Sequence, residues 1–391
     1  MKYSGAHILI ESLIAEGVDT IFGYPGGAVL FIYDELYKYQ DKIKHILVSH
    51  EQHAAHAADA YSRATGKTGV CLATSGPGAT NLVTGIATAY MDSVPLVAIT
   101  GNVATDLLGK DSFQEVDIAG ITMPVVKHNW IVKNINELSE IIREAFIVAN
   151  SGRPGPVLID IPKDITLHTT EWEPKRNTAV DSAVSERAKR LSARNTMVTW
   201  TDDDIKIAQA KITGSKRPVI FAGGGVVISD AWKELAELAQ RIDAPVASSL
   251  MALGAFPCTH KLWTGMIGMH GTVASNKAVQ NSDLLITIGA RFSDRVISHA
   301  GSFAPNAEIL QFDIDPAEVN KNIAVSACVI GNIKKTLQRT LSDLPKMQPK
   351  DSWTKKIAEF KTQIPQAHKE RQTLTPRFVI KEAAKKFGDD T

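Results

Sequence analysis

The chain has 391 residues, 44% of them hydrophobic, which is enough for two or three domains with sizeable cores. It carries 43 basic and 42 acidic residues, and this net charge of +1 gives no reason to expect a nucleic acid or a membrane surface as partner. The three widely spaced cysteines argue against a disulfide framework or a zinc site, and no segment resembles a secretory signal or a membrane span, so we expect a cytoplasmic protein.

The amino-terminal part alternates helices with short apolar strands. Helices are predicted over 4–16, from the loop at 24–27 to about residue 39, over 52–65 and over 79–91, and strands over 18–23, 45–48, 69–73, 95–100 and 155–162. Apolar strands that alternate with helices are typical of a parallel sheet covered on both faces. Ligands of such sheets bind at the carboxyl ends of the strands, so a site is expected near the loops at 23–27, 49–52, 74–78 and 101–115.

A second domain of the same kind is expected further along the chain. Residues 166–201 lose the periodicity and are predicted to be a linker. Strands are then predicted over 218–222, 245–249, 284–288 and 308–313, with helices over 203–212, 230–242, 333–343, 351–362 and 376–387. The predicted fold class is therefore α/β with two doubly wound parallel-sheet domains, 1–165 and 202–345, followed at 346–391 by a linker and the start of a third domain.

Glu51 lies where a predicted strand gives way to a helix. A carboxylate at this point can be a first-turn charge, favoured by the unpaired amides of the helix. The alanine-rich sequence after it favours a second interpretation, in which Glu51 is poorly hydrated and can share a proton with a heterocyclic cofactor. The residues alone leave both interpretations open.

Three histidines around Glu51 raise the question of a metal site. His50, His53 and His56 recur every third residue, whereas the zinc-protease pattern needs two histidines four residues apart. Side chains spaced by three spread around a helix and converge poorly on one ion. We therefore predict ordinary helix histidines and no metal ligands in this chain.

The second domain has two features that suit a nucleotide-like ligand. Gly223, Gly224 and Gly225 follow a predicted strand and can present backbone amides to a phosphate, although a plain tight turn explains them equally well. The strand over 308–313 ends in an acidic segment, 313–315, of the sort that binds ribose hydroxyls.

A series of motifs resembles the catalytic subunits of acetohydroxyacid (acetolactate) synthases, which are thiamine-diphosphate enzymes. The resemblance covers the whole chain, and its motifs occur in the order of the family. They are Gly23-Tyr24-Pro25-Gly26-Gly27-Ala28, His50-Glu51-Gln52-His53-Ala54-Ala55-His56, Thr74-Ser75-Gly76-Pro77-Gly78-Ala79-Thr80-Asn81, Phe113-Gln114-Glu115, Gly152-Arg153-Pro154-Gly155-Pro156-Val157, Gly268-Met269-His270-Gly271-Thr272, Gly289-Ala290-Arg291-Phe292 and Phe312-Asp313-Ile314-Asp315-Pro316.

The resemblance implies roles for residues of the first domain. Glu51 would contact the aminopyrimidine of thiamine diphosphate and favour its imino tautomer, and Gln114 would be the second catalytic residue. Pyruvate would be decarboxylated and its two-carbon unit added to pyruvate or 2-ketobutyrate. The remaining implied positions are Tyr24, Pro25, Gly26, Gly27 and Gly76 for the cofactor, and Phe113, Gln114 and Arg295 for the substrate.

The resemblance also implies an FAD that takes no redox part in the main reaction. Asp294 and Arg295 match a channel-lining pair in which the arginine can receive a substrate carboxylate. The implied FAD contacts are Arg153, Gly224, Met269, His270, Gly271, Thr272, Arg291, Asp313, Ile314 and Asp315.

One departure from the family concerns Mg²⁺. The family's third domain binds Mg²⁺ and the diphosphate, and its motif has no match in this sequence, so these ligands are expected outside the chain and the chain alone is expected to be inactive. The resemblance further implies a homo-oligomer and allows a small regulatory subunit. Two alternatives are a pyruvate oxidase or 2-keto-acid decarboxylase relative, and a non-catalytic flavin-binding or assembly module.

Overall fold

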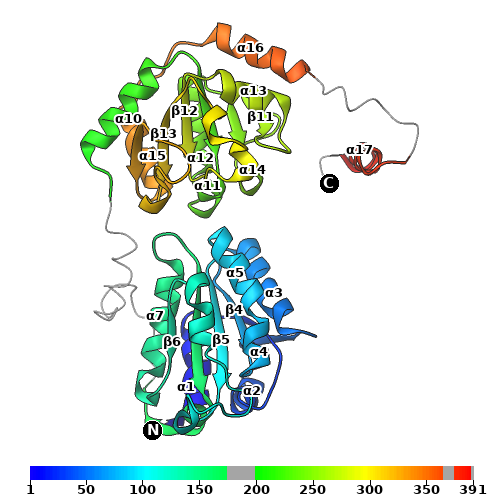
Figure 1. Ribbon diagram of the computed structural model, residues 1–391, viewed down its shortest axis with the longest axis vertical. Helices are drawn as coiled ribbons and strands as arrows, with labels where there is room; N and C mark the ends of the chain where they lie inside the picture. Colours follow the sequence, from blue (N-terminus) through cyan, green and yellow to red (C-terminus); the bar gives the residue numbers. More distant parts are fainter. Residues whose placement is uncertain (174–198, 364–373, 389–391) are drawn as a thin grey trace. The chain divides into compact units, whose positions relative to one another are not determined.

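The computed structural model describes residues 1–173, 199–363 and 374–388. They form two compact units, Met1–Met197 and Val198–Thr391, each of which is an α/β domain (Figure 1). Most of the predicted linker, 174–198, lies outside the described residues.

The first unit is built on a six-stranded sheet in the order β3-β2-β4-β5-β7-β6, and every neighbouring pair is parallel. Its strands are β2 (Thr20–Gly23), β3 (Lys44–Leu47), β4 (Gly69–Ala73), β5 (Leu96–Asn102), β6 (Asn129–Ile131) and β7 (Pro156–Pro162). Its helices are α1 (Gly5–Ala15), α2 (Leu30–Tyr37), α3 (Glu51–Thr65), α4 (Pro77–Asn81), α5 (Val83–Asp92), α6 (Ile118–Thr122), α7 (Leu138–Asn150) and α8 (Lys163–Leu167).

Helices cover both faces of this sheet (Figure 1). One core contains buried residues of α1, α2, α7 and α8, and the other contains those of α3, α4, α5 and α6. The alanines of α3 allow very close packing. A Cβ on Gly69 would lie 2.1 Å from the Ala58 carbonyl oxygen, and one on Gly85 would lie 2.3 Å from the Ala55 Cβ. The alanine-rich sequence of α3 therefore places this helix directly against β4 and α5.

The first unit extends beyond residue 165. Part of the segment predicted as linker forms the end of α8 and the strand β8 (Thr169–Glu171), which pairs antiparallel with β1 (Lys2–Ser4). The Gly5 amide also donates to the His168 carbonyl, at 3.0 Å. Backbone pairing orders these polar residues, so the hydrophobic pattern could not reveal them.

The second unit also has a six-stranded parallel sheet, in the order β11-β10-β9-β12-β13-β14. Its strands are β9 (Pro218–Ala222), β10 (Val246–Ser248), β11 (Trp263–Met266), β12 (Leu284–Ile288), β13 (Glu308–Asp313) and β14 (Ala327–Ile330). Its helices are α10 (Asp202–Gly214), α11 (Gly224–Ile228), α12 (Trp232–Ile242), α13 (Val273–Asn281), α14 (Asp294–Ile297), α15 (Ile333–Ser342), α16 (Asp351–Thr362) and α17 (Pro376–Phe387). The prediction of two doubly wound α/β domains is therefore confirmed.

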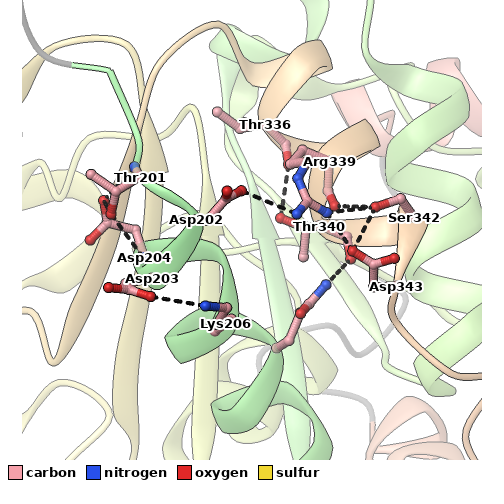
Figure 2. Close-up of polar contacts among 11 residues, drawn as sticks. Thr201, Asp202, Asp203, Asp204, Lys206, Thr336, Arg339, Thr340, Ser342 and Asp343 are labelled. Carbon is pink, nitrogen blue, oxygen red and sulfur yellow. Dashed lines mark hydrogen bonds and ion pairs between the residues drawn. The ribbon is translucent and has the colours of Figure 1, made fainter.

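Polar contacts attach the first helix of this unit to α15 (Figure 2). Thr201 caps α10 through a reciprocal pair of hydrogen bonds with Asp204. The Arg339 guanidinium donates to Asp202 at 3.1 Å and to the Ser342 hydroxyl at 2.8 Å, and it also bonds Asp343. These contacts hold the start of α10 against α15.

Helix α16 belongs to the core of the second unit, although its residues fall in the stretch predicted as a linker and third-domain start. Trp353, Ile357 and Phe360 are buried, and the Trp353 indole donates to the Pro218 carbonyl at 3.0 Å. Helix α17 has no buried residue. None of the described helices is long and apolar enough to cross a membrane.

Candidate functional site

Glu51 is the first residue of α3, next to the carboxyl end of β3, and only 9% of its surface is exposed. The ring of His50 caps the helix, because its Nδ1 accepts the Gln52 amide hydrogen at 3.1 Å. The Glu51 carboxylate instead receives a side-chain bond, in which Asn81 Nδ2 donates to Oε2 at 2.9 Å. Glu51 is thus in the first turn, as one interpretation predicted, but its carboxylate accepts a hydrogen bond from the last residue of α4.

Gly78 lies beside this carboxylate, and Thr74 lies between Gly78 and Gly26. A Cβ on Gly78 would lie 3.2 Å from Glu51 Oε1 and 2.8 Å from Thr74 Cγ2, and one on Gly26 would lie 2.5 Å from the Thr74 Cβ. Thr74 Oγ1 also accepts the Ala28 amide hydrogen at 3.2 Å. The loops after β2 and β4 therefore meet beside Glu51, and the predicted residues Gly26 and Glu51 lie in one site.

The loop that carries Phe113 and Gln114 reaches the same place. Gly76 has a φ of +60°, and a Cβ on it would lie 2.6 Å from the Gln114 carbonyl oxygen. Gln114 also has a positive φ, +56°. Phe113 is 87% exposed, so nothing in its own unit packs closely over it.

The remaining predicted residues of this loop cluster are on the surface. Tyr24 is 41% exposed, and its amide donates to the Leu72 carbonyl at 3.2 Å. Pro25 and Gly27 are exposed as well. These residues follow β2 at the same sheet edge as Glu51.

Two residues of this site were not assigned by sequence reasoning. Asn81 is inside a recognised motif, but only the structure shows that it bonds Glu51. Tyr33 is on α2, and its hydroxyl would lie 2.7 Å from a Cβ on Gly23. Among the described residues this buried hydroxyl has no hydrogen-bond partner. Burial, and to a smaller extent the negative charge of Glu51, raises the pKa of Tyr33 well above its ordinary value. Nothing in its sequence context marked Tyr33 as a site residue.

In the second unit, the predicted turn 269–272 is held in a fixed shape. The Asn276 side chain bonds both the amide and the carbonyl of Gly268, at 2.9 and 3.0 Å. The Met269 amide donates to the Arg295 carbonyl at 2.9 Å. Thr272 caps α13 by accepting the Ser275 amide hydrogen at 3.1 Å. His270 is exposed on this turn, and Gly271 is half-buried.

The three glycines after β9 divide into two kinds. A Cβ on Gly223 would lie 2.2 Å from the Gly289 carbonyl oxygen, and one on Gly225 would lie 2.7 Å from the Gly289 Cα. Both glycines therefore allow the ends of β9 and β12 to pack closely. Gly224 faces a side chain instead, since its Cβ would lie 3.1 Å from the Met251 Cβ.

The acidic end of β13 has one buried and one half-buried carboxylate. Asp313 Oδ1 accepts the Asp315 amide hydrogen at 3.0 Å, and Asp315 Oδ1 accepts the Ala317 amide hydrogen at 3.0 Å. Burial, assisted by the charge of Asp315, raises the pKa of Asp313 to about 6. Ile314 and Arg291 are half-buried at this edge of the sheet.

The remaining predicted residues are Arg153 in the first unit and Arg295 in the second, where the Arg295 backbone contacts the 269–272 turn. Arg153 is in the first unit, where its Nε donates to the Ser93 hydroxyl at 2.7 Å. Arg295 and Asp294 are exposed in the second unit, with 3.8 Å between the Arg295 Nε and Asp294 Oδ2. Across the described ranges, no group of three or more His, Cys, Asp or Glu side chains could hold a metal ion.

Comparison with protein families gives two matches. Residues 3–121 match the thiamine pyrophosphate enzyme N-terminal TPP binding domain, and residues 205–340 match the thiamine pyrophosphate enzyme central domain. Each match falls on one of the two sheets described above. These matches confirm that the chain belongs to the thiamine-diphosphate enzymes, as the motifs predicted.

Curated relatives cover the whole chain. An acetolactate synthase large subunit of Corynebacterium glutamicum is 46% identical over 100% of this chain and 61% of its own length. A probable acetolactate synthase large subunit of Methanocaldococcus jannaschii is 47% identical over 97% of this chain and 63% of its own length. An acetolactate synthase large subunit of Cyanidium caldarium is 46% identical over 97% of this chain and 65% of its own length. The chain thus spans less than two thirds of the length of these relatives.

Proposed function

Because this chain belongs to the thiamine pyrophosphate enzymes and contains their N-terminal and central domains, we propose that it acts in an acetolactate synthase large subunit. The proposed reaction decarboxylates pyruvate and joins the two-carbon unit to a second 2-keto acid. Pyruvate as acceptor gives 2-acetolactate, and 2-ketobutyrate gives acetohydroxybutyrate, both precursors of branched-chain amino acids. The names of the relatives support this reaction over the oxidase and decarboxylase alternatives.

The observation that carries the proposal is the setting of Glu51. When bound, thiamine diphosphate supplies the nucleophilic carbon and the electron sink for the decarboxylation. Asn81 holds Oε2 of Glu51, and Oε1 faces Gly78, where a side chain would crowd it. The carboxylate is therefore fixed in direction and left open on one side, which suits an acid–base group that hydrogen-bonds a flat aminopyrimidine.

The loops around Glu51 supply the remaining functions of the first unit. Gly26 and Gly78 allow the loops after β2 and β4 to pack closely beside Glu51, because a Cβ at either position would collide with Thr74. Gln114, as the proposed second catalytic residue, and Phe113 belong to a loop that touches Gly76, so they would bound the substrate side of the site. The exposure of Phe113 leaves its ring available for such a contact.

FAD is part of the same proposal, and all of its proposed contacts except Arg153 belong to the second unit. Leu250, Met251 and Met269 expose apolar side chains at the carboxyl edge of the sheet, where a flat ring system would cover them. The buried Asp313 carboxyl can accept hydrogen bonds from ribose hydroxyls. The proposed contacts remain Arg153, Gly224, Met269, His270, Gly271, Thr272, Arg291, Asp313, Ile314 and Asp315, and Arg295 remains the proposed carboxylate receptor.

The proposal includes the expected partners and surroundings. Mg²⁺ would accompany the diphosphate, a homo-oligomer would form, and a small regulatory subunit would be a possible partner. The three cysteines are all free, which suits the reducing cytoplasm.

The test is product analysis with a defined pair of variants. The chain is fused to the portion of the C. glutamicum relative that it does not match, and the fusion is given pyruvate, thiamine diphosphate, Mg²⁺ and FAD. We expect acetolactate, and we expect Glu51→Gln to slow its formation by at least about 100-fold, the usual loss for a general acid–base group. The exposed Glu140, changed to Gln, is the matched control. Acetaldehyde or acetyl phosphate as the product, or a Glu51→Gln rate equal to that of the wild type, would contradict the proposal.

A further inference from the structure

The loop between β5 and α6 has an unusual backbone. Gly109, Asp111 and Gln114 have φ values of +77°, +54° and +56°. Residues other than glycine seldom adopt this left-handed conformation, and they keep it only where surrounding contacts enforce it. Asp111 and Gln114 therefore need a contact that holds the loop.

The carboxylate of Glu115 makes that contact. Its Oε1 accepts the amide hydrogen of Gly109, and its Oε2 accepts that of Ser112 at 2.8 Å. The Glu115 amide in turn donates to the Ser112 carbonyl at 3.0 Å. One carboxylate thus uses both oxygens to join the two parts of the left-handed stretch.

Phe113 and Gln114 lie between Ser112 and Glu115, the two residues that the carboxylate ties together. The Gln114 carbonyl oxygen faces Gly76, where a built Cβ would lie only 2.6 Å away. Gly76 immediately precedes α4, the helix whose Asn81 holds Glu51. The shape of the loop therefore decides whether Gln114 reaches the Glu51 site.

We propose that Glu115 is a positioning residue, whose carboxylate clamps the 109–115 turn and so holds Phe113 and Gln114 at the Glu51 site. The hydrogen bonds of the clamp exist in the folded chain whatever its function. The role of the clamp in substrate binding rests on the proposed function. Glu115 itself touches no reacting group in this proposal.

The charge of Glu115 is central to the clamp. The Ser112 and Gly109 amides hold the pKa of this carboxyl below its ordinary value. The other charged groups on the same loop are Asp106, Lys110, Asp111 and Asp117, and Glu51 is the charged group of the neighbouring site. The backbone amides nevertheless make the largest contributions to the lowering of the Glu115 pKa. Because the folded-state pKa is lowered, the clamp is fully present above the ordinary Glu pKa and is lost as the pH falls through the lowered value.

The experiment follows the backbone amides of the full chain by NMR, in the wild type and in three variants. Glu115→Gln turns an N–H toward one of the two amides, so we expect hydrogen exchange at Gly109 and Ser112 to accelerate by about tenfold, and the signal of Gly76 to move. Glu115→Asp keeps two acceptor oxygens on a shorter stem and should fall between this variant and the wild type. Glu140→Gln should change none of these signals. In the wild type, the Gly109 and Ser112 signals should titrate together below the ordinary Glu pKa.

Two results would overturn the proposal. One is wild-type protection of Gly109 and Ser112 in Glu115→Gln, and the other is a Gly76 signal that does not respond to this change. If Glu115→Gln fails to fold, the wild-type titration and Glu115→Asp still decide the question. The NMR experiment needs no cofactor, so it tests the clamp alone. The proposed function is tested separately, because it fails if the fusion forms no acetolactate.

Discussion

Replacing Gly76 by alanine tests the close contact between the β4–α4 turn and the Gln114 loop. The residue has a φ of +60° and a ψ of −120°, a conformation that costs an L-residue about 1–3 kcal/mol. The new Cβ would lie 2.6 Å from a backbone carbonyl oxygen, and such overpacking costs about 1–3 kcal/mol more. The reduced entropy of the unfolded chain offsets about 0.4–1 kcal/mol of this. The first unit should therefore lose about 2–5 kcal/mol of unfolding free energy.

Gly66→Ala is the matched control, because Gly66 has a φ of +72° but would place its Cβ in open space. It should cost only the backbone strain, about 1–2 kcal/mol. Because the chain has two compact units, the assay is native-state hydrogen exchange of buried β4 and β5 amides under increasing urea, which reports on the first unit. If Gly76→Ala is no less stable than Gly66→Ala, the contact with Gln114 is not as tight as described, and the reasoning fails.

Three further predictions concern single side chains. Burial raises the pKa of Asp160 to about 6 from an ordinary 3.8, so the free energy of unfolding of the first unit should fall by up to about 3 kcal/mol as the pH rises from 3.8 to 6. Urea unfolding at both pH values should show this fall, and Asp160→Asn should remove it. Trp353→Phe removes a buried indole and its hydrogen bond to Pro218, so the second unit should lose about 1–3 kcal/mol of unfolding free energy, as measured by urea unfolding. The control Trp232→Phe, at a 49% exposed residue, should lose less than about 0.5 kcal/mol. Asn81→Ala removes the donor to Glu51 and should weaken binding of the aminopyrimidine half of thiamine by about tenfold, as measured by NMR titration; unchanged affinity would show that Asn81 does not orient the carboxylate.

The central strands were predictable because burial on both faces leaves a largely apolar run, which Gln311 interrupts in β13. Four predicted strands, 69–73, 218–222, 284–288 and 308–313, have the bounds of β4, β9, β12 and β13. The strands that the sequence did not reveal are β1, β6, β8, β11 and β14, of three or four residues each. Of these, β6, β11 and β14 lie at the edges of the six-stranded sheets, and β1 and β8 pair only with each other. An edge strand pairs on one side only and can be short, so it carries little hydrophobic pattern.

Helix predictions were correct where an apolar face or a cap marked the boundaries. The bounds of α16 and α17 are those predicted, with Thr375 capping α17. The predicted helix over 79–91 is instead two helices, α4 and α5, which meet at Leu82. The hydrophobic pattern continues through this break because Leu82 is itself buried in the core.

The site was only partly predictable. Glu51, Gly26 and Gly76 were expected at one sheet edge, and the structure brings them together through contacts that no sequence spacing encodes. Asn81 was missed as a partner of Glu51 because the two residues are 30 positions apart and meet only through the order of the strands. The roles of Gln114 and of the FAD residues stay predictions.

The most direct test of the account is whether Glu51 receives an aminopyrimidine. The isolated aminopyrimidine half of thiamine needs no diphosphate site, so it can be titrated into the full chain while the amide signals of Gly26, Gly76, Gly78 and Asn81 are followed by NMR. The account predicts saturable shifts at these four residues, with at least about tenfold weaker binding in Glu51→Gln, since a hydrogen bond to a charged group is lost. Shifts located elsewhere, or equal affinity in Glu51→Gln, would contradict it.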